Sequence, residues 1–214
     1  MRRINKSNFI TAFSITTLIF IAGFATSSVL YDNKVSHVQQ TYNQLYLDSM
    51  EIEAQYDLAY SDVCDTELLV TLSRNLNDMG DKLDYLDRTL TDESLQDLVR
   101  NTKRQYFMLE VKHSIFVEQV NAECGYEYPI VFYFYSNRDC PACELQGVIL
   151  TEYKQDYPNT MVYSFDIASD SAIVDTLVKK YDVVKTPTIV HEDTAFDYTL
   201  PRSELDAVIE QSVN

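Results

Sequence analysis

The chain has 214 residues, of which 46% are hydrophobic and 23% charged, and this composition excludes a wholly disordered protein because it leaves ample apolar material for a core. Its 33 acidic residues outnumber its 17 basic ones and give a net charge of -16. This balance argues against nucleic-acid binding, which needs clustered Lys and Arg to neutralise phosphates. The acidic residues are spread along the chain, so they favour solubility over any one partner.

The beginning of the chain predicts a membrane segment. A basic stretch, residues 1–8, precedes residues 9–30, "FITAFSITTLIFIAGFATSSVL", which contain no charge. As a helix, residues 9–30 would be about 33 Å long, enough to cross a bilayer. The basic flank predicts a cytoplasmic tail, a single transmembrane signal-anchor in the cell membrane, and an extracytoplasmic remainder. Small residues ending at Ala25 leave a second interpretation open, in which a signal peptide is cleaved there and the protein is secreted.

Export of the remainder, which both interpretations share, affects how the four cysteines are interpreted. In an oxidising compartment, cysteines form disulfides more often than they remain thiols. Along the sequence they fall into two pairs, Cys64 with Cys124 and Cys140 with Cys143.

Residues 31–126 predict a helical stalk domain, because apolar residues recur there every three or four positions with few helix breakers. Interruptions near Cys64 and at "TLTDES" divide the stretch into three antiparallel helices packed as in a coiled coil, with Thr91 as the expected N-cap of the third. The apolar seam of that third helix includes His113, which we expect to be a core histidine and not a ligand.

If these helices run up, down and up from the membrane, Cys64 and Cys124 lie at the same distal end. A structural disulfide between them would close a loop of about 60 residues and stabilise the fold by about 4 kcal/mol in the chain-entropy model. Free thiols, or a relay that exchanges disulfides with the second cysteine pair, are the alternatives.

Residues 127–214 change to alternating short strands and helices in the order β-α-β-α-β-β-α, which predicts a mixed four-stranded sheet and makes the chain α+β overall. The expected strands are residues 130–136, 160–167, 186–192 and 195–200, and the expected helices are residues 141–157, 169–182 and 201–213.

Residues 128–214 resemble the thioredoxin superfamily, most closely its minimal, glutaredoxin-like version. The sequence Cys140-Pro-Ala-Cys143 stands between the first strand and the first helix, and Thr186-Pro187 opens the third strand. A β-hairpin and a terminal helix follow in the family's order. The resemblance implies a redox dithiol at the two cysteines, a cis Pro187 beside it, and a Thr186 whose backbone pairs with an extended substrate strand. Residues 31–126 carry no such resemblance.

The position of Cys140 and Cys143 at the start of the expected helix also explains their reactivity in physical terms. A helix N-terminus stabilises a thiolate, the species that attacks disulfides, so Cys140 at the start of the helix is the expected nucleophile. Cys143, one turn later, can resolve the mixed disulfide. Pro141 suits the first helical turn because it has no N–H and its φ is fixed.

Two positions depart from the family pattern. The family keeps a buried aspartate six residues before the first cysteine, where this chain has Phe134, so the internal proton acceptor of an efficient reductase is missing. The tryptophan that usually precedes the first cysteine is Asp139, whose carboxylate opposes thiolate formation, while Arg138 would compensate. The direction of the net effect on Cys140 stays open.

The sequence thus predicts a membrane-anchored thiol–disulfide oxidoreductase acting on exported protein thiols and disulfides, with oxidation or isomerisation favoured over reduction. It needs no bound organic cofactor, but turnover needs a redox partner, which we expect to be a membrane protein with its own dithiol. A zinc site is disfavoured because the cysteine pair and His191 supply three ligands where about four are needed. A redox-silent docking module, whose helical domain binds a partner, is the second hypothesis.

Overall fold

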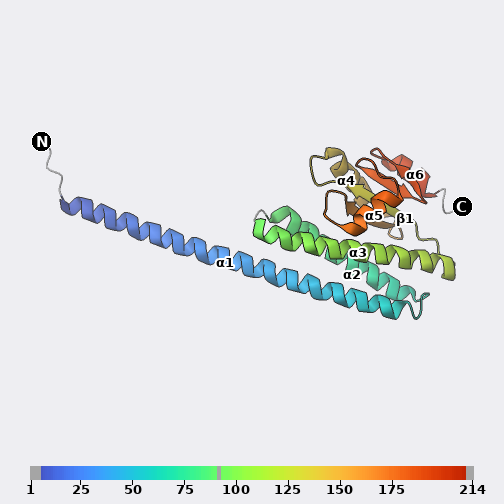
Figure 1. The fold of residues 1–214 in the computed structure, drawn as a ribbon, viewed down its shortest axis with the longest axis horizontal. Helices are drawn as coiled ribbons and strands as arrows, with labels where there is room; N and C mark the ends of the chain where they lie inside the picture. The colour runs from blue at the N-terminus through green and yellow to red at the C-terminus, as the bar shows by residue number, and fades with distance from the viewer. Residues whose placement is uncertain (1–5, 91–92, 211–214) are drawn as a thin grey trace. The chain divides into compact units, whose positions relative to one another are not determined.

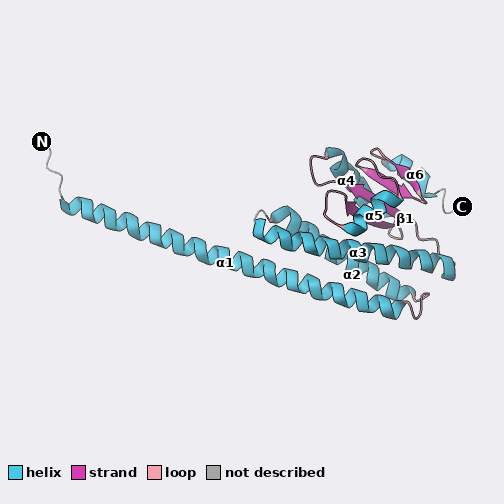
Figure 2. Ribbon diagram, in the orientation of Figure 1, coloured by secondary structure: helices cyan, strands magenta, loops and turns pink. Residues whose placement is uncertain are grey.

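The computed structural model describes residues 6–90 and 93–210 of the chain. Most of the predicted cytoplasmic tail and the predicted cap Thr91 therefore lie outside the described residues. Within them the chain is α+β, with six helices and one four-stranded mixed sheet (Figure 2). The chain divides between Gln44 and Leu45 into two units, which are described separately.

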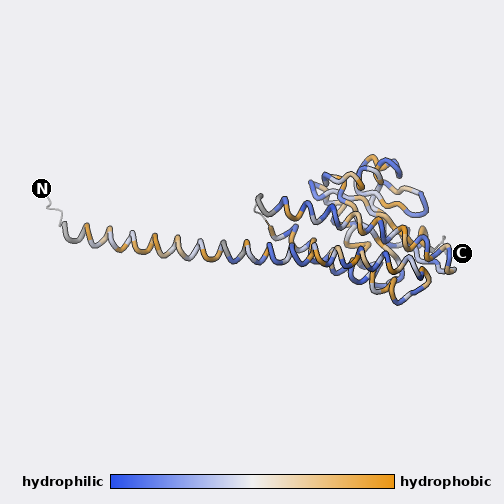
Figure 3. The backbone as a smooth tube through the Cα atoms, turned by 60° about the horizontal axis from the view of Figure 1, so that its bottom comes forward, coloured by the Kyte–Doolittle hydropathy of each residue, from blue (hydrophilic) through white to orange (hydrophobic). Residues whose placement is uncertain are grey.

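The first unit consists of most of helix α1 (Lys6–Ala59), which runs without a break through the predicted membrane segment and beyond it. By length and composition, this helix could cross a membrane, as an anchor or as a signal sequence, and none of its most apolar stretch is buried. Figure 3 shows the apolar colouring along its N-terminal part. The hydroxyls of Thr17 and Thr26 donate to the carbonyls four residues earlier, at 2.9 and 2.8 Å, so they have partners within the helix itself.

The second unit begins with the end of α1 and continues into α2 (Thr66–Thr89) and α3 (Glu93–Cys124). Asp65 is the N-cap of α2, and its carboxylate accepts hydrogen bonds from the amides of Glu67 and Leu68 at 3.0 and 3.1 Å. Helix α3 ends at Gly125, whose φ of 72° lies in the left-handed region that stops helices. The apolar stripes expected from the sequence are buried, among them Leu45, Ile52, Tyr56, Leu69, Leu72, Leu76, Met79, Leu83, Leu86, Val99, Leu109, Phe116 and Val120.

A disulfide joins Cys64, in the turn between α1 and α2, to Cys124, the last residue of α3. Their Cα atoms are 5.6 Å apart, and 60 positions separate them in the sequence. The crosslink therefore closes the long loop expected from the up-down-up arrangement of the helices.

The sheet contains β1 (Ile130–Tyr135), β2 (Met161–Asp166), β3 (Thr188–His191) and β4 (Thr194–Phe196), in the order β2-β1-β3-β4. Strands β1 and β2 are parallel, and β3 is antiparallel to both of its neighbours. Strand β4 is shorter than the expected residues 195–200. The helices that connect or follow the strands are α4 (Pro141–Asp156), α5 (Ala172–Lys180) and α6 (Arg202–Glu210).

Each face of the sheet is covered by its own set of helices (Figure 1). On one face, α4 and α6 bury an apolar cluster with the strands, formed by Val131, Tyr133, Leu150, Tyr153, Ile189, Leu200, Leu205 and Ile209. On the other face, α3 and α5 pack together, and the rings of Phe107 and Phe165 lie 5.9 Å apart. Helix α3 therefore belongs both to the three-helix bundle and to the core of the sheet. The predicted domain boundary after residue 126 stays a prediction.

Glu110 of α3 covers the open edge of the sheet. The amides of Met161 and Ile167 donate to carbonyls of the β1 segment, at 2.8 and 2.9 Å, so the alternate amide of Ser164 faces away from β1. Glu110 Oε1 accepts that amide at 2.9 Å. Because β2 is an edge strand, this bond satisfies a donor that another strand could otherwise bind.

His113 is the core histidine that its place in the apolar seam predicts. Its Nδ1 lies 2.6 Å from the hydroxyl of Tyr163 on β2, and its Nε2 lies 2.9 Å from the hydroxyl of Ser73 on α2. Burial, with a smaller contribution from Lys154, lowers the pKa of His113 to about 4, so the ring is neutral near pH 7.

We predict that Tyr56→Phe stabilises the protein by about 1 kcal/mol, because a buried hydroxyl without a partner carries a desolvation cost that phenylalanine lacks. Tyr56 is fully buried, and its hydroxyl has no hydrogen-bond partner among the described residues. Its ring, which phenylalanine keeps, makes edge contacts with His113 and Phe116 at 6.2 and 6.0 Å. Urea denaturation measures the change.

Tyr133→Phe is the matched control, because the hydroxyl of Tyr133 donates to the carbonyl of Cys143 at 2.6 Å and its removal should destabilise the fold. Loss of stability in Tyr56→Phe, equal to that of the control, would contradict the prediction.

Candidate active site

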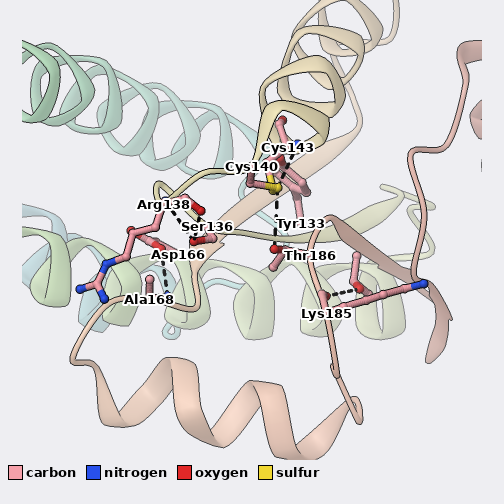
Figure 4. Close-up of a disulfide and its surroundings, with 10 residues drawn as sticks. Tyr133, Ser136, Arg138, Cys140, Cys143, Asp166, Ala168, Lys185 and Thr186 are labelled. Carbon is pink, nitrogen blue, oxygen red and sulfur yellow. Dashed lines mark hydrogen bonds between the residues drawn. A yellow bond between two sulfur atoms is a disulfide. The ribbon is translucent and has the colours of Figure 1, made fainter.

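Cys140 and Cys143 form a disulfide at the N-terminus of α4, directly after the loop that follows β1 (Figure 4). Cys140 is the N-cap, Pro141 occupies the first helical turn, and the Cys140 sulfur accepts the Cys143 amide at 3.2 Å. Cys143 is 5% exposed, whereas Cys140 is only partly buried. A molecule approaching from solvent therefore meets the Cys140 sulfur first.

The segment before β3 meets this disulfide. The Thr186–Pro187 peptide bond is cis, and the Thr186 hydroxyl lies 3.8 Å from the Cys140 sulfur. The Thr188 hydroxyl donates to the carbonyl of Lys185 at 2.8 Å and helps to fix the turn. Residues 46 positions apart in the sequence thus meet at one sulfur atom.

Two consecutive aromatic residues of β1 point to opposite faces of the sheet, Tyr133 toward α4 and α6 and Phe134 toward Phe165 on the side of α3. Phe134, at the position where the resemblance would place an aspartate, is fully buried, and its ring lies 5.7 Å from that of Phe165. Tyr133 donates its hydroxyl to the carbonyl of Cys143, and burial raises its pKa, which keeps the hydroxyl a donor. Tyr133 could not be recognised as a site residue from the sequence, because an aromatic residue in a buried strand indicates core packing and nothing more.

The loop before Cys140 is polar and exposed. The backbone N–H of Arg138 donates to the Ser136 hydroxyl at 3.1 Å, and Asp139 adopts a φ of 45° before the helix begins. Figure 4 shows the Arg138 side chain extending away from the disulfide.

The helical bundle reaches this loop through Asp87 of α2. Its Oδ2 accepts hydrogen bonds from Lys103 Nζ at 2.7 Å and from Asn137 Nδ2 at 3.0 Å. The Lys103 side chain is only 12% exposed and also lies 3.7 Å from Asp166, at the end of β2. This contact has no signal in the sequence, because its residues come from separate segments and none belongs to a motif.

We predict that Asp87→Ala destabilises the protein by about 1–3 kcal/mol, because it removes the bond to Asn137 and leaves the largely buried Lys103 with only the more distant Asp166. Urea denaturation provides the measurement. Asp84→Ala, on the same helix, removes an exposed pair with Arg88 and should change stability by less than about 1 kcal/mol. Equal losses of unfolding free energy in the two variants would show that the contacts of Asp87 stabilise the protein no more than an exposed ion pair does.

The structure does not bring His191 to the cysteines. Strand β3 starts at Thr188, beside the site, and ends at His191, which pairs with Val131 near the start of β1. His191 Nδ1 lies 2.8 Å from the carbonyl of Ile130. Among the residues described, no three His, Cys, Asp or Glu side chains come close enough together to hold a metal ion.

Comparisons with protein-family models and with curated proteins give no match. Among solved structures, the chain is similar to one described as a malarial protein, with 21% identity and a TM-score of 0.35 over 41% of this chain and 100% of that one. It is also similar to thioredoxin O2 from Arabidopsis thaliana in its oxidised state, with 24% identity and a TM-score of 0.35 over 48% of this chain and 87% of that one. At these values, neither likeness assigns a function.

Proposed function

We propose that this protein is a membrane-anchored, extracytoplasmic thiol–disulfide oxidoreductase with a thioredoxin-like domain, and that Cys140 and Cys143 exchange with the thiols and disulfides of exported proteins. The observation that carries the proposal is the position of the pair. The disulfide lies at a helix N-terminus, with its more exposed sulfur 3.8 Å from Thr186, whose bond to Pro187 is cis.

Substrate oxidation would proceed through two exchanges. A substrate thiolate attacks the Cys140 sulfur, the bond to Cys143 breaks, and Cys143 leaves as a thiolate that takes up a proton. A second substrate thiolate then attacks the substrate sulfur of the mixed disulfide, and Cys140 leaves as a thiolate. The substrate gains one disulfide, and two electrons pass to the cysteine pair. A partner protein with its own disulfide accepts these electrons by the same exchange in reverse.

The residues around the pair suit these steps. The N-terminus of α4 favours the Cys140 thiolate as a leaving group, because the Cys143 amide points at the sulfur at 3.2 Å. Cys143 is buried, so the mixed disulfide forms at Cys140, and in the reducing direction Cys143, one turn away, resolves it. Phe134, at the position where the resemblance would place an aspartate, offers no proton acceptor, which favours oxidation or isomerisation over reduction.

The apolar stretch of α1 supports a membrane anchor. Basic residues before it favour a cytoplasmic N-terminus and an active site on the outer side, where disulfide exchange is useful. Cleavage after Ala25 would give the same enzyme in secreted form.

A turnover assay tests this function. Catalytic amounts of the purified full-length chain, in detergent, are mixed with a reduced, unfolded substrate protein and a disulfide-containing oxidant. We expect the chain to accelerate disulfide formation or rearrangement in the substrate. Absence of acceleration in both the oxidising and the reducing direction would leave the alternative, a redox-silent docking module whose helices bind a partner.

A further inference from the structure

A second site lies at the end of the sheet away from Cys140. A pocket of about 310 Å³ opens where β1 begins and β3 ends, and Ile130 and His191 are among its lining residues. The segment from Tyr126 to Pro129 and the end of α3 complete its walls. At the lower end of the usual size range, such a pocket suits one side chain better than a large cofactor.

Two pairs of aromatic rings stand in the wall of the pocket. The rings of Tyr126 and Tyr128 are stacked at 5.5 Å with an angle of 27° between their planes. The rings of Phe132 and Tyr181 lie 5.3 Å apart at 32°. All four residues line the pocket, so it offers aromatic surface to a ligand.

Acidic residues from three separate segments also line the pocket. Glu118 comes from α3, Glu127 from the segment before β1, and Glu192 and Asp193 from the turn between β3 and β4. These two turn residues have φ angles of 47° and 63°, which are typical of a tight hairpin. No lysine or arginine is among the described residues that line the pocket, and Lys180, next to the lining residue Tyr181, interacts with two of the four acids, Glu118 and Asp193.

Hydrogen bonds hold the frame of the pocket before any ligand arrives. Asn121 donates to the carbonyl of Tyr128 at 2.9 Å and accepts the amide of the same residue at 3.0 Å. These two hydrogen bonds fix the segment that carries Tyr126 and Glu127. A preformed site loses less conformational freedom on binding.

A cation of the chain itself already interacts with one of these rings. Lys180 Nζ lies 4.7 Å from the centre of the Tyr181 ring. The pKa of Lys180 is raised first by its hydrogen bond with Tyr181, with smaller contributions from Tyr181, Glu118 and Asp193. The surroundings of the pocket thus favour a positive charge.

We propose that this pocket binds a guanidinium group, the side chain of an arginine in a partner polypeptide. Guanidinium is planar and stacks on aromatic faces, and its fork of N–H donors matches carboxylates, which makes it a better fit than a compact ammonium. The net charge of -16 would attract basic segments from a distance. The proposal is independent of the redox function.

The test is a calorimetric or NMR titration of the full-length protein in detergent with a blocked Gly-Arg-Gly peptide. The comparison ligand is the same peptide with citrulline, which keeps the shape of arginine and removes its charge. We expect saturable binding of the arginine peptide that is at least about fivefold tighter than that of citrulline and weakens with salt. Equal binding of both peptides, or no saturable binding, would overturn the proposal, and equal binding of a lysine peptide would overturn the choice of guanidinium.

Variants then locate the site. Glu118→Gln, and separately the double change Glu192→Gln with Asp193→Asn, should each weaken arginine binding by about fivefold or more. Glu152→Gln, on the exposed face of α4, removes one negative charge outside the pocket, as Glu118→Gln does inside it, and should leave binding unaltered. Equal weakening by Glu152→Gln would show that net charge, not the pocket, attracts the peptide. Urea denaturation of each variant confirms that it folds.

Discussion

Cys140→Ala is expected to lose disulfide exchange by about a hundredfold or more. With a disulfide-bonded substrate, Cys143→Ala is expected to accumulate a mixed disulfide, because the Cys140 thiolate attacks the substrate disulfide, one substrate sulfur leaves as a thiolate, and no Cys143 resolves the product. The two outcomes differ because the sulfur atoms differ in their surroundings. Cys140 is the more exposed, accepts the amide of Cys143 and lies beside Thr186, whereas Cys143 is 5% exposed. Turnover assays and mass spectrometry after acid quenching measure both effects.

The other disulfide provides the control for that prediction. A chain with Cys64→Ala and Cys124→Ala together loses a crosslink across 60 positions, so it should be less stable and yet retain exchange. If Cys140→Ala retained full exchange, or if the mixed disulfide formed through Cys143, the assignment of the nucleophile would be wrong.

Glu110→Gln is expected to stabilise the protein above pH 8 by several kcal/mol and to remove most of the loss of stability between pH 6.5 and 8. Burial raises the pKa of Glu110 from 4.5 to about 8, and the Ser164 amide, the Tyr106 hydroxyl and Lys154 oppose that shift only in part. Lys154 in turn interacts with Asp81 and donates to Asn77 at 2.7 Å. Glutamine keeps an oxygen that accepts the Ser164 amide and never ionises.

The sign follows from proton binding in the two states. Between its unfolded and folded pKa values, the Glu110 carboxyl is ionised in the unfolded chain and protonated in the folded one. Stability therefore falls as pH rises through this range, by about 1 kcal/mol per pH unit. His113 has the opposite sign: because its folded pKa is lowered, its contribution is present above pH 6.5 and is lost as pH falls toward 4. Of these two effects, that of Glu110 is the one that acts between pH 6.5 and 8.

Urea denaturation at a series of pH values provides the measurement. Glu123→Gln changes a glutamate on the same helix that interacts with Gln119 near the surface, and it should leave the slope unaltered. A slope in Glu110→Gln equal to that of the unaltered chain would refute the role of Glu110.

Many helices and strands could be predicted from the sequence, because the spacing of apolar residues along a single segment indicates whether it is a helix or a strand. The repeat of apolar residues places Leu69, Leu76 and Leu83 on the buried side of α2, where they lie. The contiguous apolar run from Ile130 to Tyr135 forms β1, with its four central residues buried.

Other features could not be predicted, because they depend on contacts between distant segments. The face of α3 that packs on the sheet carries the buried residues Phe107, Glu110 and Val117. Because one of them is a carboxylate, the spacing of apolar residues does not reveal this second buried face. The contact of Asp87 with Asn137 joins residues 50 positions apart, and neither residue type indicates the other. The expected strand at residues 195–200 is shorter, and Asp197 beyond its end pairs with Lys185 at 3.2 Å.

The cysteine pair could be located because strand, motif and helix are contiguous. Its relation to Thr186 followed only from the resemblance, because the sequence cannot show which distant loop meets a helix N-terminus. Tyr133 was missed because the role of its hydroxyl depends on the position of the Cys143 carbonyl.

The central claim is that Cys140 and Cys143 form a reversible redox couple within a protein whose other disulfide is structural. The full-length chain in detergent is equilibrated in graded glutathione buffers, quenched with acid, alkylated and analysed by mass spectrometry. We expect Cys140 and Cys143 to be reduced together at one midpoint reduction potential while Cys64 and Cys124 stay bridged. A low midpoint potential would indicate a reductase, and a high one an oxidant or isomerase. If Cys140 and Cys143 stay bridged in every buffer, the protein is not a disulfide-exchange enzyme.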